Sequence, residues 1–240
     1  MTQIEQTAVR NRLLAALSPD DFALLAPALQ PTKLELKQVL YAAHQPIGTA
    51  YFPENGTVSM LAPLEDGRFM EVGLVGREGL VGLSVVLGAD SSATEAMVQM
   101  QGTAFQIRSA KLKEASEVSP TLRGLLLRYV HVYHAQVAQT AACNGHHLLE
   151  ERLARWLLMA HDRARTDEYP MTQEFMSLML GVRRAGVSIA AGILQKAGVI
   201  DYKHGCIIVL DRPGLEAMAC ECYGTVRQQF ERLLGSPAGE

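Results

Sequence analysis

The stretch from Thr172 to Ile200 restricts the fold more than any other part of this 240-residue chain. Thr172 is a favourable N-cap, and apolar residues then recur at three- and four-residue steps as far as Leu180, which predicts a short helix. Gly181 interrupts this pattern, and a glycine is the residue expected where a turn needs a positive φ angle. A second helix is predicted after it, with a buried side formed by Val182, Val187, Ala190, Ala191 and Leu194. Two helices joined by a glycine turn indicate either a helix-turn-helix or an ordinary helical hairpin.

The second predicted helix begins with cations and small side chains. Arg183 and Arg184 are followed by Ala185, Gly186 and Ser188, so this end of the helix can enter a DNA major groove without a clash. The planar fork of an arginine matches guanine O6 and N7, or a phosphate. The alternative is that both arginines are only solvated.

A predicted β-hairpin follows directly and favours the DNA-binding interpretation. Gly198 can end the helix, and Val199–Tyr202 and Cys206–Leu210 are typical of two strands joined by a turn at Lys203–Gly205. A helix-turn-helix followed by a hairpin is a winged version of the motif, and the tip of the wing can reach the phosphate backbone. The residues predicted to contact DNA are Thr172, Gln173, Arg183, Arg184, Ala185, Ser188, Lys203 and His204.

The distribution of charge agrees with a nucleic-acid partner, although the net charge of the chain is −3. Residues 1–144 contain 11 Lys/Arg and 13 Asp/Glu, and residues 213–240 contain 2 and 4. Residues 145–212 contain 9 Lys/Arg, 8 Asp/Glu and four histidines, so the segment with the predicted helix-turn-helix is the one positive segment.

The first half of the chain has a different pattern. Residues Arg10–Leu29 predict a helical beginning that restarts at Ser18, and short β-rich runs alternate with turn residues from Gln30 to about Ile107. This spacing predicts a β-sandwich or jelly roll, and therefore an α+β chain. The expected strands are Val39–Tyr41, Thr49–Phe52, Thr57–Leu61, Phe69–Val72, Ala96–Met100 and Ala104–Ile107, with turns at Gln45–Gly48, Pro53–Gly56 and Glu65–Arg68.

Glycine recurs at every third residue from Gly73 to Gly82. The run lacks the Gly-Lys-Ser/Thr of a phosphate loop, so it either lets the chain turn tightly between strands or forms a cradle for a small ligand. Candidate ligand-binding residues in this region are Gly79, Gly82, Leu83, Ser91 and Ser92.

A long helix is predicted from about Ser119 to Ala142, with a mixed stripe along one side. We expect this stripe to form a dimer interface, the alternative being burial against the β-domain. The residues assigned to dimerisation are Leu122, Leu125, Tyr129, Val132, Tyr133 and Gln136. Cys143–Gly145 is the expected hinge, followed by a helix over His146–Arg163 and, after the hairpin, a helical tail over Leu215–Leu234. The expected domains are residues 1–118 (sensor), 119–143 (dimerisation helix) and 144–240 (winged helix-turn-helix with the tail).

This order of elements resembles the cyclic-AMP receptor / fumarate-nitrate regulator (Crp/Fnr) family of transcription factors. The resemblance is strongest in Glu151–Leu157, Leu180–Arg184 and Ala197–Ile200. It implies a homodimer that binds an inverted repeat in double-stranded DNA, contacts RNA polymerase and responds to a signal in a cyclic-nucleotide-binding-like domain. Arg184 stands where the family has its usual recognition-helix arginine, whereas Ala185 and Ile189 replace its glutamate and further arginine.

The sensor half departs from the cyclic-nucleotide members of that family. Leu83 stands where they have a carboxylate, and no arginine lies near Ser92 to bind a cyclic phosphate. Cyclic AMP is therefore not expected to bind, and the signal is an unidentified small molecule, a redox change, or absent. The iron–sulfur members have N-terminal cysteines, whereas the first cysteine here is Cys143.

No cofactor, metal or enzymatic activity is predicted. Cys220 and Cys222 form a CxC without a second pair at zinc spacing, and the His131/His134 and His146/His147 pairs lack suitable partners nearby in sequence. A competing interpretation is a ligand- or haem-binding sensor in which the helix-turn-helix is scaffolding. The scattered cysteines and the lack of a long apolar run predict a cytoplasmic protein without a membrane segment.

Overall fold

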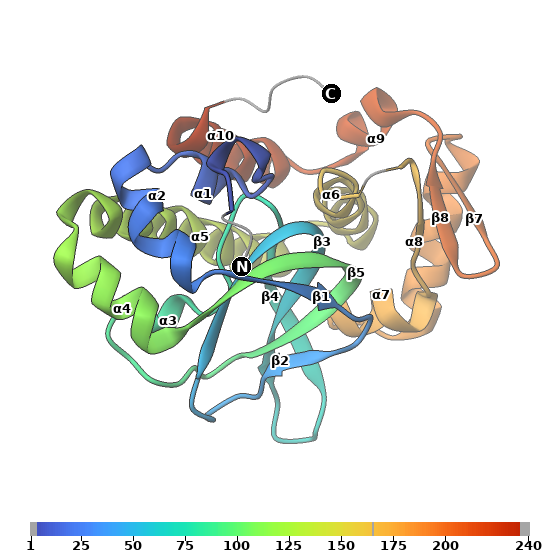
Figure 1. Cartoon of the computed structure of the whole chain (residues 1–240). Helices are drawn as coiled ribbons and strands as arrows, with labels where there is room; N and C mark the ends of the chain where they lie inside the picture. The colour runs from blue at the N-terminus through green and yellow to red at the C-terminus, as the bar shows by residue number, and fades with distance from the viewer. Residues whose placement is uncertain (1–3, 165, 236–240) are drawn as a thin grey trace.

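The computed structural model describes residues 4–164 and 166–235. Figure 1 shows a β-domain flanked by short helices, a long helix α5 (Pro120–His146) behind it, and a helical domain with a small sheet on the other side. This arrangement confirms the predicted α+β fold with a C-terminal winged helix-turn-helix.

The predicted N-terminal helix is divided into short pieces. They are η1 (Gln6–Ala8), α1 (Arg12–Ala15), α2 (Pro19–Leu25) and η2 (Ala26–Ala28). The predicted restart is confirmed, because Pro19 occupies the first helical position of α2 and the Ser18 Oγ accepts a hydrogen bond of 3.1 Å from the Asp21 N–H.

The β-domain contains an antiparallel five-stranded sheet in which two strands are much longer than expected. The strands are β1 (Gln30–Leu34), β2 (Val39–Tyr41), β3 (Thr49–Pro63), β4 (Phe69–Val75) and β5 (Glu95–Arg108). Their order is β1-β5-β3-β4, and β2 also pairs with β5. Strand β3 joins the predicted strands Thr49–Phe52 and Thr57–Leu61, and β5 joins Ala96–Met100 and Ala104–Ile107.

The predicted turn at Pro53–Gly56 is wrong, because this segment stays paired within the sheet. Shifts of register between β3 and β5 accommodate it, and Gly56 has a φ angle of 81°. A Cβ atom there would lie 2.6 Å from the Met100 carbonyl oxygen. Gly56 therefore supplies a bulge and not a chain reversal.

Helix α5 begins and ends close to the predicted limits but continues through the expected hinge. It follows α3 (Leu83–Val86) and α4 (Ser109–Val118), and the Ser119 Oγ caps it by accepting a 3.1 Å hydrogen bond from the Leu122 N–H. Residues Cys143–Gly145 are helical, and the chain leaves the helix at His147, which has φ −100° and ψ 153°. The break between α5 and α6 therefore lies at His147–Leu148.

The stripe on α5 that was assigned to dimerisation is buried within the single chain. Leu122, Tyr129 and Gln136 are fully buried, and the Gln136 Nε2 donates a 2.9 Å hydrogen bond to the Leu74 carbonyl in β4. Leu125 and Val132 are also buried, whereas Tyr133 is half-buried. The prediction that this face meets a second copy is thus wrong, because the β-domain and a later helix already cover it.

The C-terminal half is a helical domain with a three-stranded sheet in the order β6-β8-β7. Strand β6, which pairs with the wing, was not predicted. The elements are α6 (Leu149–His161), β6 (Glu168–Pro170), α7 (Gln173–Leu180), α8 (Arg184–Lys196), β7 (Ile200–Lys203), β8 (Cys206–Val209), α9 (Arg212–Met218) and α10 (Cys222–Leu234).

The helical tail divides into two helices that pack on different halves of the molecule. Helix α9 packs against α6, whereas α10 lies mainly against α5. Val226 and Phe230 of α10 belong to the same buried cluster as Leu13 and Leu14 of α1. The ribbons of these two helices lie side by side in Figure 1. The last helix therefore completes the core of the first half of the chain.

Buried polar contacts join the β-domain to the helical domain. The Trp156 indole N–H in α6 donates a 2.6 Å hydrogen bond to Glu71 in β4, and Arg163 forms a 2.6 Å ion pair with Glu78, with both side chains less than 10% exposed. Burial raises the pKa of Glu71 to about 7, although hydrogen bonds from Ser59 and Trp156 oppose the shift.

No single helix in the described ranges is long and apolar enough to cross a membrane. Helices α7 and α8 satisfy the length and composition criteria only as a pair, with a bend of 106° between them.

Candidate functional site

The turn between α7 and α8 has the geometry of a helix-turn-helix. The Thr172 Oγ1 caps α7 by accepting a 3.1 Å hydrogen bond from the Phe175 N–H. Gly181 ends α7 with a φ angle of 65°, and the chain bends by 106° before α8. This angle falls within the range that is typical of the motif.

Helix α8 presents one face to the core and the opposite face to solvent. Val187, Ala190, Ala191 and Leu194 are buried as predicted, whereas Val182 lies before the helix and is half-buried. The exposed face carries Arg183, Arg184, Ala185, Ser188 and Ile189.

The two arginines at the beginning of α8 differ in position. Arg183 is the N-cap residue with extended backbone, and its side chain does not cap the helix. Arg184 is the first helical residue. Neither guanidinium has a hydrogen bond or an ion pair within residues 4–164 and 166–235, so both are available to an external anion or base.

The beginning of α7 is fastened to α8 and to the wing. The Ser188 Oγ donates a 2.8 Å hydrogen bond to the Gln173 Oε1, and the Gln173 backbone N–H donates to the Tyr202 hydroxyl at 3.2 Å. Thr172 is exposed beside them. Residues predicted separately as DNA contacts on the two helices are thus brought together.

The wing has the predicted hairpin form with a shorter turn. His204 and Gly205 have φ angles of 51° and 79°, which is typical of a two-residue type I′ connection. Lys203 pairs with Asp201 at 2.5 Å, and this contact raises the pKa of Lys203. Lys203 and His204 are both exposed at the tip.

A largely apolar cavity of about 290 Å³ lies between the β-domain and α5. Three of the predicted ligand-binding residues, Gly82, Leu83 and Ser92, line this cavity. Polar groups in the lining include the hydroxyls of Tyr41, Ser84, Ser92, Thr94 and Tyr133 and the imidazole of His134. The Ser92 Oγ lies 2.9 Å from the Thr94 Oγ1. The cavity has no arginine or carboxylate among its lining residues in the described chain.

Gly79 and Ser91 are not part of the cavity lining. Gly79 serves packing, because a Cβ at this position would overlap the hydroxyl of Tyr129. The glycine run is therefore mainly a tight connection from β4 to α3, and only its last member, Gly82, reaches the cavity, with a φ angle of 103°. The tight connection is thus observed, whereas a role of Gly82 in binding a ligand stays a prediction.

Three of the four cysteines lie together, although they are far apart in sequence. Cys143, Cys220 and Cys222 are buried near His147, whereas Cys206 lies at the start of β8. A hydrogen bond from Cys220 lowers the pKa of Cys143 to about 5 and raises the pKa of Cys220, while the hydrogen bond with Cys143 raises the pKa of His147. The CxC of Cys220 and Cys222 was visible in the sequence, but its partners Cys143 and His147 were missed. The spacing of four residues between Cys143 and His147, at the end of α5, is the sequence signal that indicates a second pair of ligands.

Comparisons with known proteins agree with this geometry. Residues 151–218 match the model of the Crp-like helix-turn-helix domain. No curated protein sequence matches the chain. Several solved structures match most of it at low identity, which establishes a common fold.

Three of these structures span nearly the whole of their own chains. FixK2 from Bradyrhizobium japonicum has a TM-score of 0.69 at 18% identity, covering 80% of this chain and 98% of its own. A putative Crp/Fnr-family regulator from Eubacterium rectale has a TM-score of 0.67 at 17% identity, covering 86% and 96%. The c-di-GMP-responsive regulator CLP from Xanthomonas campestris has a TM-score of 0.63 at 15% identity, covering 80% and 99%.

The resemblance to the Crp/Fnr family is confirmed. The chain carries a Crp-like helix-turn-helix domain in residues 151–218. Its β-domain, long helix and C-terminal domain together have the fold of Crp/Fnr regulators.

Proposed function

We propose that this protein is a dimeric, sequence-specific DNA-binding regulator of transcription. The observation that carries the proposal is the exposed face of α8, where the side chains of Arg183 and Arg184 have no hydrogen bond or ion pair within residues 4–164 and 166–235 and the opposite side of the helix is buried. Such a face can enter a major groove while the domain behind it stays intact. The proposal includes no catalytic step and no haem.

Base recognition is assigned to the first two turns of α8. Arg184 supplies a fork for guanine, and Ile189, which is 68% exposed, supplies an apolar surface that suits a thymine methyl group. Arg183, Thr172, Gln173 and the wing residues Lys203 and His204 are assigned to phosphates. The Lys203–Asp201 pair is solvent-exposed on the lysine side, so a phosphate can replace it at small cost.

Dimerisation is assigned to the outward face of α5, which we define as Leu127, His131, His134, Ala138 and Ala141. These residues are exposed and recur at steps of four, three, four and three, so they form one continuous stripe. Small side chains at its C-terminal end allow close approach of a second helix. A two-fold dimer would place two recognition helices about 34 Å apart, to read an inverted repeat.

The signal is assigned to the apolar cavity beside α5. A cavity of about 290 Å³ that is lined mainly by apolar groups, with a few hydroxyls and the imidazole of His134, suits a small and mostly apolar molecule. It lacks the charged partners that a cyclic phosphate needs, so cyclic AMP is not expected as the effector. Contact of the active dimer with RNA polymerase belongs to the same proposal.

Selection of bound sequences from random duplex DNA tests the proposal directly. The expected result is an inverted repeat whose half-sites are separated by about one helical turn. Competition with unrelated duplexes then gives the specificity ratio at a stated salt concentration. Recovery of unenriched sequences at low salt would reject a sequence-specific function.

A further inference from the structure

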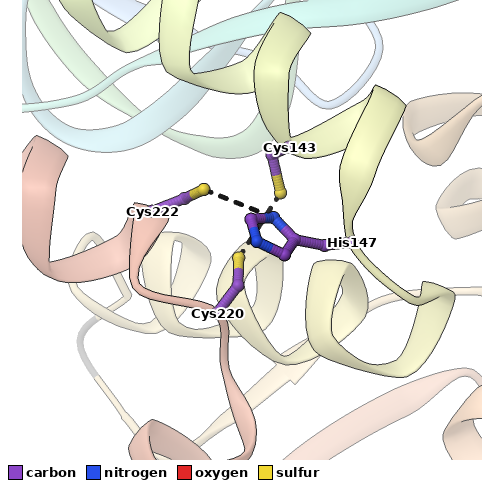
Figure 2. A group of neighbouring side chains, drawn as sticks. All are labelled: Cys143, His147, Cys220 and Cys222. Atoms are coloured by element: carbon purple, nitrogen blue, oxygen red, sulfur yellow. Dashed lines mark hydrogen bonds between the residues drawn. The ribbon is translucent and has the colours of Figure 1, made fainter.

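Three cysteines and one histidine from two distant segments form a compact cluster at the end of α5. Cys143 and His147 are four residues apart, so they lie on the same side of the chain as it leaves the helix. Cys220 and Glu221 lie in the break between α9 and α10, and Cys222 is the first residue of α10. Figure 2 shows the three sulfur atoms arranged around the imidazole of His147.

The spacing of the four side chains is that of ligands to a single ion. The sulfur atoms of Cys143 and Cys220 are 3.4 Å apart, and the Cys222 sulfur lies 3.5 Å from the His147 Nδ1. All four potential ligand atoms lie within 4.8 Å of one another. Tetrahedral zinc with zinc–sulfur bonds of about 2.3 Å requires ligand separations of about 3.8 Å, so small side-chain adjustments would suffice.

The kind of ligands and their burial indicate a structural metal site, in which all coordination positions are filled by protein side chains. Three cysteines and one histidine are a common ligand set for structural zinc, and four protein ligands leave no position for a substrate. All three cysteines are buried, and the His147 side chain is only 20% exposed. An iron–sulfur cluster would place its ligands on different iron atoms, and therefore farther apart than these four.

The surrounding groups orient the ligands as metal sites require. The Nε2 of His147 lies 3.3 Å from the Glu221 carboxylate, which leaves the Nδ1 directed at the cysteines. The Gln139 Nε2 donates a 3.0 Å hydrogen bond to the Cys222 sulfur. A carboxylate behind a ligand histidine fixes its tautomer, and an N–H donor stabilises a thiolate.

We propose that Cys143, His147, Cys220 and Cys222 bind one zinc ion. The ion would fasten the end of α5 to the beginning of α10, next to the His147–Leu148 break that leads into α6. It would thus fix the junction between the long helix and the helix-turn-helix domain. The proposal does not depend on DNA binding, since metal content can be measured without DNA.

Metal analysis of the full-length chain, purified under reducing conditions without added zinc, is the first test. The expected result is one zinc per chain after dialysis. Cobalt(II) added to the metal-free protein should give the visible bands of tetrahedral coordination and a thiolate charge-transfer band, and zinc should abolish both. Absence of stoichiometric zinc and of these bands, with all four thiols reactive, would overturn the proposal. A Cys143–Cys220 disulfide in the reduced, zinc-supplied protein would also overturn it.

Cys222→Ser and Cys206→Ser form a matched pair for the second test, because Cys206 lies on the wing, outside the cluster. Cys222→Ser should lose the charge-transfer band and bind zinc far more weakly, whereas Cys206→Ser should bind as the wild type does. Equal loss in both variants, or no loss in Cys222→Ser, would contradict the assignment.

Glu221→Gln tests the same zinc site without removing a cysteine, and it therefore replaces Cys222→Ser if that variant fails to fold. Because Glu221 does not touch the ion, its removal should leave four ligands and weaken zinc binding about 10-fold. Circular dichroism monitors folding of each variant. Unchanged zinc affinity in Glu221→Gln, together with unchanged affinity in a folded His147→Asn variant, would overturn the assignment of the histidine.

Discussion

At the scale of single residues, Arg183 and Arg184 are neighbours with different expected roles. Arg184 lies in the first turn of α8, and Arg183 precedes the helix with extended backbone. Both side chains are exposed and make no hydrogen bond or ion pair within the described chain, so their removal should affect folding little. The sequence was sufficient to predict this pair, because buried and exposed positions alternate with helical periodicity.

Arg184→Ala is expected to cost about 1–3 kcal/mol of binding free energy on the selected site, and to relax preference at one base pair per half-site, if its fork binds guanine. Arg183→Ala should instead weaken binding to all duplexes alike and reduce the salt slope. Fluorescence anisotropy on specific and random duplexes at several salt concentrations distinguishes the two. Wild-type affinity of Arg184→Ala for both duplexes would exclude this recognition mode.

Glu71 provides a residue-scale prediction on stability. The folded-state pKa of Glu71, about 7, exceeds the ordinary value of 4.5. The protein therefore keeps its full stability with respect to this group below about pH 4.5 and loses stability as the pH rises from there through 7. Glu71→Gln stays neutral and can still accept the Trp156 hydrogen bond. The variant should lie within about 1 kcal/mol of the wild type at pH 5 and be more stable by about 3 kcal/mol at pH 8.

Urea unfolding of both proteins at the two pH values checks this prediction. Thr103, an exposed residue of β5, offers a control position at which Thr103→Ser should give the same small difference at pH 5 and pH 8. A Glu71→Gln variant that is less stable than the wild type at pH 8 would show that the carboxylate is ionised and needed there.

At the scale of elements, the sequence was sufficient to predict the positions of most helices and strands, but not which elements pack against their buried faces. The apolar stripe of α5 was recognised, yet periodicity identifies a buried face without naming its partner, and the stripe packs inside the chain. Strand β3 was divided at Pro53–Gly56 because these are turn-forming residues, whereas pairing with β5 kept them in the sheet. Tertiary pairing overrode the local turn preference in β3, whereas in α5 the periodicity was correct and only the partner of the buried face was wrong.

The outward face of α5 supplies the prediction at this scale. Ala138→Glu places a charge in the middle of the exposed stripe and should convert the dimer to a monomer at micromolar concentration. Ala110→Glu on the exposed side of α4 is the matched control and should leave the dimer unchanged. Light scattering measures both, and a wild-type chain that is already monomeric would refute the interface.

The complete cluster of Cys143, His147, Cys220 and Cys222 could not be deduced from local sequence, because each half of it carries only two of the four residues. Cys220 and Cys222 were visible as a CxC, but Cys143 lies 77 residues before Cys220 and joins it only because α10 packs on α5. Neither the His131/His134 pair nor the His146/His147 pair has enough metal ligands nearby in sequence. His147 lies beside Cys220 and Cys222 only in the folded chain. A cluster of this kind depends on topology, which local spacing does not encode.

At the scale of the whole molecule, the Glu78–Arg163 pair fastens the β-domain to the helical domain. The Glu78 Oε1 accepts hydrogen bonds from the Gly76 N–H at 3.0 Å and from the Arg163 Nη2 at 2.6 Å. Glu78→Gln leaves a buried guanidinium without its counter-ion and should cost about 3–5 kcal/mol of stability.

The Glu78→Gln/Arg163→Met double variant should recover much of that loss, because no unpaired charge remains buried. Unfolding free energies of the wild type, the two single variants and the double variant give the coupling energy. Additive single effects would show that the two side chains act independently and that the junction does not rely on their pairing.

The return of α10 to the first half of the chain has a consequence for biosynthesis. Val226 and Phe230 fill a core that also contains Leu13 and Leu14, so residues that leave the ribosome early depend on packing partners that are synthesised much later. Domains of most chains can fold in order as they emerge. Here the core around Leu13 and Leu14 stays incomplete until α10 has been synthesised and has left the exit tunnel. The β-domain half therefore cannot complete its folding before the helix-turn-helix of α7 and α8, which precedes α10 in the chain, has also emerged.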